Sequence, residues 1–110
     1  MTTDFAAPDT RRDLDTTSQA RIDEHDVLWR GRAWCALAPI EATIVRTLIE
    51  SQPRVVSRDE LTARVWPDGA PKGRPVDGRL HRLRERLEPL GVHIHSIRQR
   101  GLLLDVDPPG

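Results

Sequence analysis

The chain has 110 residues, a length that allows a single domain with one modest hydrophobic core. Its formal net charge of zero at first argues against a nucleic-acid binder. No apolar run approaches the ~20 residues of a membrane span, and no secretory signal is recognisable. The single cysteine excludes an internal disulfide, so we expect a protein of the reducing cytoplasm with no membrane contact.

The charge is distributed unevenly along the chain. Residues 1–26 carry a net charge of −4, residues 27–110 carry +4, and residues 72–100 alone carry +5. The positive charge is therefore concentrated in one segment near the C-terminus, where it favours a polyanionic partner.

Three parts are expected from composition. Residues 1–18 contain only Phe5 and Leu14 as sizeable hydrophobes, which predicts a disordered acidic and polar tail. Residues 19–107 form the folded domain, and residues 108–110 a frayed C-terminus. The acidic tail also suggests an autoinhibitory contact with the basic segment, as a hypothesis.

The domain begins with β structure. Apolar runs at residues 27–29 and 33–37 surround an Arg-Gly-Arg turn, a pattern typical of a β-hairpin, and a further strand is possible near Ile22. We expect Cys35 to be a buried small hydrophobe rather than a reactive thiol.

The first predicted helix starts at Pro39. Proline suits the first helical position, Glu41 in the first turn suits the positive end of the helix dipole, and Pro53 ends the run.

The second predicted helix has the clearest local signal in the sequence. Ser57 and Glu60 form a capping box, and Val56 can pack on Leu61 as a hydrophobic staple. The helix ends after Trp66, which we expect to be buried.

The third predicted helix covers residues 74–88. Its apolar residues fall at steps of four, three and four, which places them in one stripe that must face a core: Val76, Leu80, Leu83 and Leu87. Arg79, Arg82 and Arg86 share another face, flanked by His81 and Arg84. This pattern indicates a helix that lies in a DNA major groove, since phosphates require cations and guanine edges suit the guanidinium fork. The alternative is an ordinary amphipathic surface helix.

A second hairpin is expected at the C-terminus, with strands at residues 92–98 and 102–106 around residues 99–101. His93 and His95 face the same side of the first strand. A metal site there has no acidic ligand spacing to support it, so we expect exposed strand residues and no metal.

Four segments, in order and spacing, resemble the OmpR/PhoB-type DNA-binding domain of bacterial response regulators. Residues 37–41 resemble the family's LTPxE helix start, and residues 54–66 its RVVSRxELxxxVW second helix. Residues 74–87 resemble RxVDVHIxRLRxKL, the recognition helix, and residues 97–101 the TVRGxGY wing.

The resemblance implies an α+β fold: a winged helix-turn-helix with a short N-terminal antiparallel sheet, three helices and a C-terminal β-hairpin wing. It also implies site residues. Arg82, Arg79 and Arg86 would face base edges; Arg74, His81 and Arg84 would hold phosphates; Arg98 would reach the minor groove from the wing, which also carries Arg100. For Arg84 and Arg98 the alternative is a surface ion pair with Glu88 or a nearby aspartate.

The chain departs from the family pattern at several positions. Ala38 stands where the family has a threonine N-cap, and Gly78 with Arg79 replaces a Val-His pair. In the wing, Gln99 replaces a glycine and Leu102 a tyrosine. These changes affect the base sequence that is read, whereas the cations remain.

We therefore expect a bacterial, cytoplasmic and nucleoid-associated regulator of transcription that binds double-stranded DNA sequence-specifically, as a homodimer or in tandem, without a cofactor. No catalytic motif suggests an enzyme. No receiver domain is recognisable, so control would come from a partner or from oligomerisation. The alternative is a winged-helix module that binds a protein, such as RNA polymerase or another regulator, with weak or no DNA binding.

Overall fold

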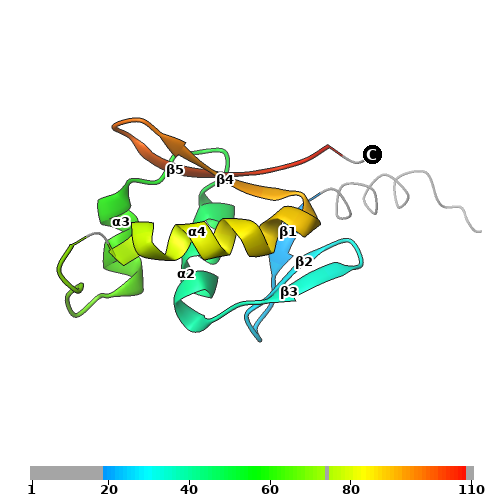
Figure 1. Cartoon of the computed structure of the whole chain (residues 1–110), viewed down its shortest axis with the longest axis horizontal. Helices are drawn as coiled ribbons and strands as arrows, with labels where there is room; N and C mark the ends of the chain where they lie inside the picture. Colours follow the sequence, from blue (N-terminus) through cyan, green and yellow to red (C-terminus); the bar gives the residue numbers. More distant parts are fainter. Residues whose placement is uncertain (1–18, 74, 109–110) are drawn as a thin grey trace, which may run out of the picture.

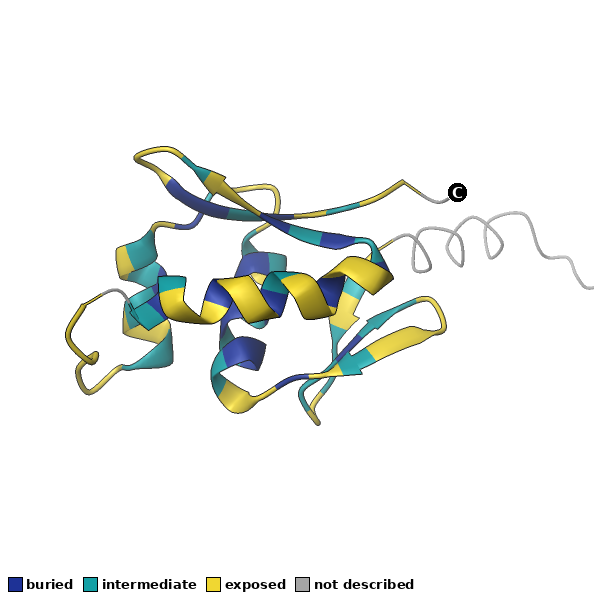
Figure 2. Cartoon of the chain, in the orientation of Figure 1, coloured by how far each residue is buried: buried dark blue, intermediate teal, exposed yellow. Residues whose placement is uncertain are grey.

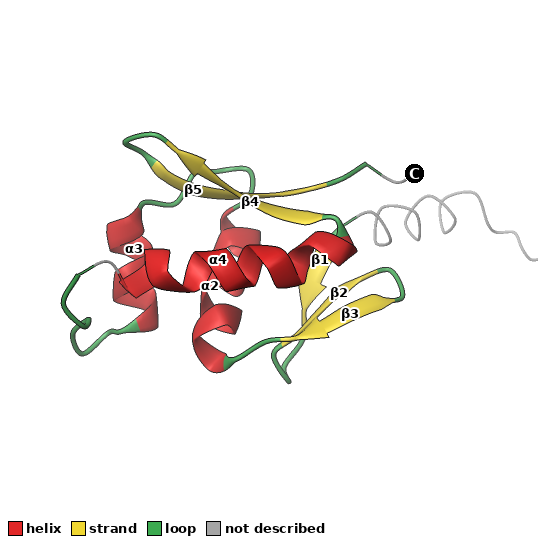
Figure 3. Ribbon diagram, viewed as in Figure 1, coloured by secondary structure: helices red, strands yellow, loops and turns green. Residues whose placement is uncertain are grey.

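A small antiparallel sheet, three helices and a C-terminal β-hairpin follow one another along the chain (Figures 1 and 3). The computed structural model describes residues 19–73 and 75–108. The predictions for residues 1–18, for Arg74 and for the last two residues lie outside this range. The elements are β1 Ala20–Ile22, β2 Val27–Arg30, β3 Ala33–Ala36, α2 Pro39–Ser51, α3 Arg58–Val65, α4 Pro75–Leu87, the short 3₁₀ helix η1 Glu88–Leu90, β4 Val92–Ile97 and β5 Gly101–Val106.

The expected architecture is confirmed. The first sheet has the order β1-β2-β3, and β4 pairs with β5 as a separate antiparallel hairpin. In Figure 1, α4 runs across the front of the molecule between this hairpin and the β1–β3 sheet, with α2 behind it. The arrangement is a winged helix-turn-helix.

One aliphatic core joins these elements, as the composition predicts. Its members come from the first sheet, all three helices and the hairpin, and include Leu28, Ile44, Leu61, Leu83 and Leu102, each fully buried. Because β4 and β5 contribute Ile94 and Leu104 to the same core, the hairpin is packed on the helices rather than extended into solvent.

The two predicted N-caps differ from the sequence pattern. Ser57 accepts a hydrogen bond from the Glu60 backbone N–H at 3.0 Å, but the Glu60 carboxylate pairs with Arg54 at 3.1 Å. At α2 the reverse half is present: Ala38 has no side-chain acceptor, yet its N–H donates to Glu41 Oε1 at 2.9 Å. Each helix thus has one half of a capping box: at α3 Glu60 pairs with Arg54, and at α2 the alanine has no side-chain oxygen to accept a hydrogen bond.

Candidate nucleic-acid interface

Helix α4 is fixed along its whole length by an apolar stripe. Val76, Leu80, Leu83 and Leu87 are all buried, as their spacing predicts. Proline at the first position starts the helix, and η1 with Gly91 in the left-handed conformation (φ 70°) ends it. Figure 2 shows the opposite face of α4 as a row of exposed residues along the front of the molecule. The helix is about 20 Å long, and its diameter of about 10–12 Å with side chains fits the width of the DNA major groove.

Arg79 and Arg82 are the arginines of α4 that remain available. Both are exposed, and neither makes a hydrogen bond or ion pair with another residue in the described part of the chain. They line an open groove of about 580 Å³ together with Gly78, which exposes the helix backbone, and Arg86. Two unpaired guanidinium groups on a rigid helix can bind an external anion without first breaking an internal contact.

Arg86 is held by the protein itself. Its Nη1 lies 2.5 Å from Glu41 Oε1, and its Nη2 donates to the Ala36 carbonyl. Burial is the largest single influence on Arg86 and opposes its charged form, but the hydrogen bond and charge attraction of Glu41, with smaller contributions from Cys35, together raise the pKa of the guanidinium. Since the Glu41 side chain is only 10% exposed, this pair compensates a nearly buried carboxylate and joins the end of α4 to the start of α2.

Arg84 also has internal partners, although not those expected from the sequence. Its Nε donates to the Ile94 carbonyl at 2.9 Å and its Nη2 to Ser96 Oγ at 2.8 Å, both on β4. The alternative of an ion pair with Glu88 is therefore not what the structure contains. Arg84 connects the helix to the hairpin.

His81 stands apart from the arginine contacts. Its side chain is 86% exposed and lies 3.5 Å from Glu85, one turn further along α4. An exposed pair of this kind contributes little to stability. His81 is therefore accessible from solvent at the position where the family resemblance implies a phosphate contact.

The wing tip carries two further cations. Arg98 and Arg100 are exposed in the turn between β4 and β5, and the described residues offer neither of them a carboxylate partner. Between them, Gln99 takes a left-handed conformation (φ 63°), where the family pattern has glycine. The turn still closes, with the Arg100 N–H donating to the Ile97 carbonyl at 3.0 Å.

The base of the wing is attached to the segment between α2 and α3. Val56 and Leu102 exchange two backbone hydrogen bonds of 2.8 Å. Gly101 has φ 140°, and a Cβ there would overlap the backbone of Val56 and Ser57. Glycine is required at this position, because only a residue without a side chain allows this approach.

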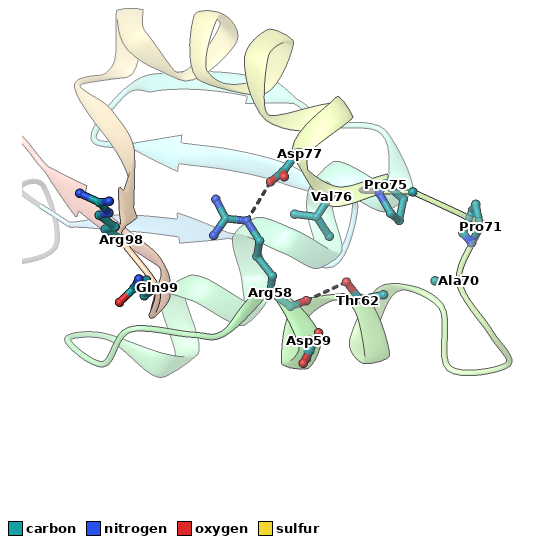
Figure 4. Close-up of a pocket in the computed structure, with 11 residues that line it drawn as sticks. Arg58, Asp59, Thr62, Ala70, Pro71, Pro75, Val76, Asp77, Arg98 and Gln99 are labelled. Atoms are coloured by element: carbon teal, nitrogen blue, oxygen red, sulfur yellow. Dashed lines mark hydrogen bonds and ion pairs between the residues drawn. The ribbon is translucent and has the colours of Figure 1, made fainter.

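A groove of about 620 Å³ separates the wing tip from the helices (Figure 4). Arg98 and Gln99 form one side, and Asp77 and Arg58 the other, joined by an ion pair of 2.9 Å. This pair ties the first turn of α4 to the first turn of α3. No local pattern in the sequence indicates this pair, because Arg58 lies 19 residues before Asp77.

Three expectations about individual side chains are revised. Trp66 is only partly buried, because it follows the last turn of α3 and borders an exposed loop. Cys35 is partly buried as well, since β3 is a short edge strand, on which Trp34 is 60% exposed. His93 is half-buried rather than exposed, and it pairs with Asp107 at 2.8 Å.

The described residues contain no group of three or more ligands placed to hold a metal ion. His93 and His95 do share one face, with ring centroids 6.3 Å apart, but they pair separately with Asp107 and Asp105. None of the described helices combines the length and apolarity that crossing a bilayer requires.

Solved structures similar to this chain come from bacterial regulators. The C-terminal domain of the nisin resistance regulator NsrR, a lantibiotic response regulator, is 25% identical with a TM-score of 0.67, covering 77% of this chain and 89% of that domain. A streptococcal redox sensor evolved from two-component response regulators is 29% identical with a TM-score of 0.66, covering 80% of this chain. This chain spans 40% of that protein.

A third structure has the same fold at lower identity. The DNA-binding domain of the response regulator AdeR, solved in complex with an intercistronic region, is 24% identical with a TM-score of 0.66. The aligned region covers 80% of this chain and 95% of the AdeR domain. No curated protein sequence matches the chain significantly.

The family model for the C-terminal domain of transcriptional regulatory proteins matches residues 31–104, from the β2–β3 turn to the second strand of the wing. This match spans the sheet edge, all three helices and the hairpin whose geometry is described above. The chain therefore belongs to this family, the OmpR/PhoB-type winged helix-turn-helix domains, and is a DNA-binding domain of a transcription regulator.

Proposed function

We propose that this domain reads a specific sequence of double-stranded DNA, with α4 in the major groove and the wing at the adjacent minor groove. The observation that carries the proposal is that Arg79 and Arg82 have no partner among the described residues and lie on the exposed face of a helix whose other face is buried. A base-reading side chain must be both rigidly mounted and free to bind, and these two meet both conditions.

The remaining basic residues are proposed to contact phosphates or the minor groove. We assign phosphate binding to His81 and to Arg74, the latter on the family resemblance alone. We assign the minor-groove contact to Arg98, with Arg100 beside it at the wing tip. Arg86 is left out of the base-reading set, because it would have to release Glu41 and the Ala36 carbonyl to reach DNA.

Selection from a random duplex library tests this proposal. The purified chain is expected to enrich a defined motif, and the same selection with Arg82→Ala is expected to lose preference at one or two positions. A contact of this type contributes about 1–3 kcal/mol of discrimination. Circular dichroism and thermal melting of the variant control for folding. Failure of the folded wild-type chain to enrich any motif would refute sequence-specific reading.

A second candidate function has one specific observation in its favour. Trp34 is 60% exposed beside Trp29 on the outer face of the β1–β3 sheet, with ring centroids 6.3 Å apart. Exposed aromatic residues are enriched in protein interfaces. A protein-binding module with weak DNA binding would give no enriched motif while remaining folded, and pull-down with RNA polymerase would then be changed by Trp34→Ala and not by Arg82→Ala.

We further propose that two copies bind adjacent half-sites. One copy presents a single helix and a single wing, whose contacts cover only a few base pairs. The selected motif is then expected to contain two repeats one helical turn of DNA apart, and the complex to have two chains per duplex by light scattering. A single unrepeated motif bound by one chain would contradict this expectation.

A further inference from the structure

Arg84 connects the recognition helix to the wing through two hydrogen bonds. Its Nε donates to the Ile94 carbonyl at 2.9 Å, and its Nη2 donates to the Ser96 hydroxyl at 2.8 Å. Both acceptors belong to β4, so one planar guanidinium group contacts two successive residues on the same face of this strand. A lysine in its place would have one nitrogen for two acceptors.

The Ile94 carbonyl has no partner in the hairpin itself. In an antiparallel pair, alternate residues direct their N–H and C=O groups toward the partner strand. The Asp107 N–H donates to the Gly91 carbonyl, which places the odd-numbered residues of β4 in the bonded set. The even-numbered Ile94 therefore directs its carbonyl to the open edge of the strand, where Arg84 caps it.

Both strands of the wing are hydrogen-bonded to the helical part of the domain, and the contact on β4 lies near the wing tip. On β5, Leu102 is bonded to Val56 between α2 and α3. On β4, Ser96 is bonded to Arg84 of α4, and Ser96 lies two residues before Arg98. The contact with Arg84 is thus the one described side-chain link that ties the distal part of β4 directly to α4.

We propose that Arg84 is a positioning residue that sets the place of the wing, and hence of Arg98, relative to α4. The expected effect of Arg84 on DNA affinity rests on the proposed function. The expected effect on the position of the wing rests on the two hydrogen bonds alone. In the proposed complex, α4 can contact the major groove while the wing contacts the adjacent minor groove only if the distance between α4 and the wing is correct. Arg84 fixes that spacing.

The competing assignment is the phosphate contact that the family resemblance implies for Arg84. Other titratable groups line the groove of about 370 Å³ between α4 and β4, namely His81, Glu85, Glu88, His93 and His95. The contacts found for these groups do not involve Arg84: His81 pairs with Glu85, and the two β4 histidines pair with aspartates of the second wing strand and the segment after it. The Arg84 guanidinium is thus directed to β4.

Amide hydrogen exchange on the free protein tests the positioning role without DNA. Ser96→Ala removes one acceptor and leaves every cation in place, and Arg84→Lys keeps the charge while removing the fork. Both are expected to speed exchange of the wing-tip amides, including that of Arg100, roughly three- to tenfold, with α2 and α3 unchanged. Ser96→Thr, which keeps the hydroxyl, and Arg82→Ala are expected to leave the tip unchanged. Unchanged wing-tip exchange in both test variants would overturn the proposal.

A double-mutant cycle on DNA tests the functional consequence, with the duplex enriched in the selection as the probe. Ser96→Ala is expected to weaken binding about three- to tenfold, although it removes no charge. Combined with Arg98→Ala, it is expected to add less than twofold to the loss from Arg98→Ala alone, because placing the wing correctly no longer brings the Arg98 cation to the DNA.

The outcomes separate the two assignments for Arg84. If Ser96→Ala binds like the wild type, or if its loss adds fully to that of Arg98→Ala, Arg84 does not act through the wing and the proposal fails. A phosphate contact would instead show as a salt slope reduced by about one in Arg84→Ala and unchanged in Ser96→Ala. If no duplex is enriched, the proposed function fails, and the exchange experiment still decides whether Arg84 positions the wing.

Discussion

The exposed surface of helix α4 carries two pairs of arginines in different states. Arg79 and Arg82 extend to solvent and have no partner among the described residues, whereas Arg84 and Arg86 are each bound to two internal acceptors. Each of the four arginines is next to a leucine in the sequence, so the local context does not separate them. The difference is in the elements packed beside them. Arg84 lies beside β4 and Arg86 beside the start of α2, and both elements supply acceptors.

The comparison shows that the arginines of a basic helix in a small domain can serve two different roles, stabilising the fold and binding an external anion. A guanidinium group that donates to buried or edge carbonyls stabilises the fold, and one without an internal partner is available to DNA. Counting arginines on a helix therefore overestimates its DNA contacts. The variants below test this division.

Arg86→Ala should produce the largest effect. The substitution leaves Glu41, which is 7% exposed, without its cation, so the free energy of unfolding should fall by about 2–3 kcal/mol. Urea denaturation measures this loss. Arg79→Ala is the matched control and should change the free energy of unfolding by no more than about 0.5 kcal/mol, because Arg79 has no partner among the described residues. An Arg86→Ala variant that unfolds like the wild type but binds DNA poorly would place Arg86 among the base-reading residues instead.

Arg82→Lys should act on specificity alone. The charge is kept and the planar fork is lost, so the ratio of specific to mixed-sequence affinity should fall by about 1–2 kcal/mol while the salt dependence of binding stays unchanged. Fluorescence anisotropy with the selected duplex and with mixed-sequence DNA at several salt concentrations measures both quantities. A loss that is equal on the two probes would mark Arg82 as a phosphate contact.

Arg98→Ala should give a smaller loss that depends less on base sequence. The slope of log affinity against log salt should decrease by about one, with no change in thermal stability, because Arg98 has no carboxylate partner in the described part of the chain. Isothermal titration over a salt series measures the slope. If stability fell instead, the wing arginine would belong with Arg84 and Arg86 as a structural residue.

The smallest effect is expected from an arginine pair far from α4. The hydrogen bond from Arg54 lowers the pKa of Glu60 below its usual 4.5, so the pair stabilises the fold fully above that value and less as the pH falls through the folded-state pKa. Glu60→Gln should therefore flatten the fall of the melting temperature between about pH 6 and about pH 3. An equal acid dependence in both proteins would show that Glu60 contributes nothing, as is common for exposed pairs.

Much of the fold could be predicted because its signals are local. The stripe of α4, the proline at the start of α2 and the Ser57 cap each depend on residues within a few positions of one another, and the structure has all three where they were expected. Loops and burial were less predictable. Trp66 is a large apolar residue, but its burial depends on how the following loop runs.

The division of labour among the arginines could not be predicted from the sequence. Spacing on the helix places Arg79, Arg82 and Arg86 on one face, but the contact of Arg86 with Glu41 joins residues 45 apart. The bonds from Arg84 to β4 depend on the angle at which the hairpin returns. A signal was present at Glu41, whose first-turn position near an alanine N-cap suggested a role for its carboxylate, but nothing local indicated the cation.

The contact of Gly101 with the α2–α3 connection limits which substitutions the wing can accept. The residues of the wing tip are exposed and can be exchanged, which under the proposed function would change the DNA sequence that is preferred. The backbone at Gly101 tolerates no such freedom, since any larger residue would push the strand off Val56 and carry the whole tip with it. New specificities are therefore expected to arise by replacement within the turn, and insertions at its base to abolish binding altogether.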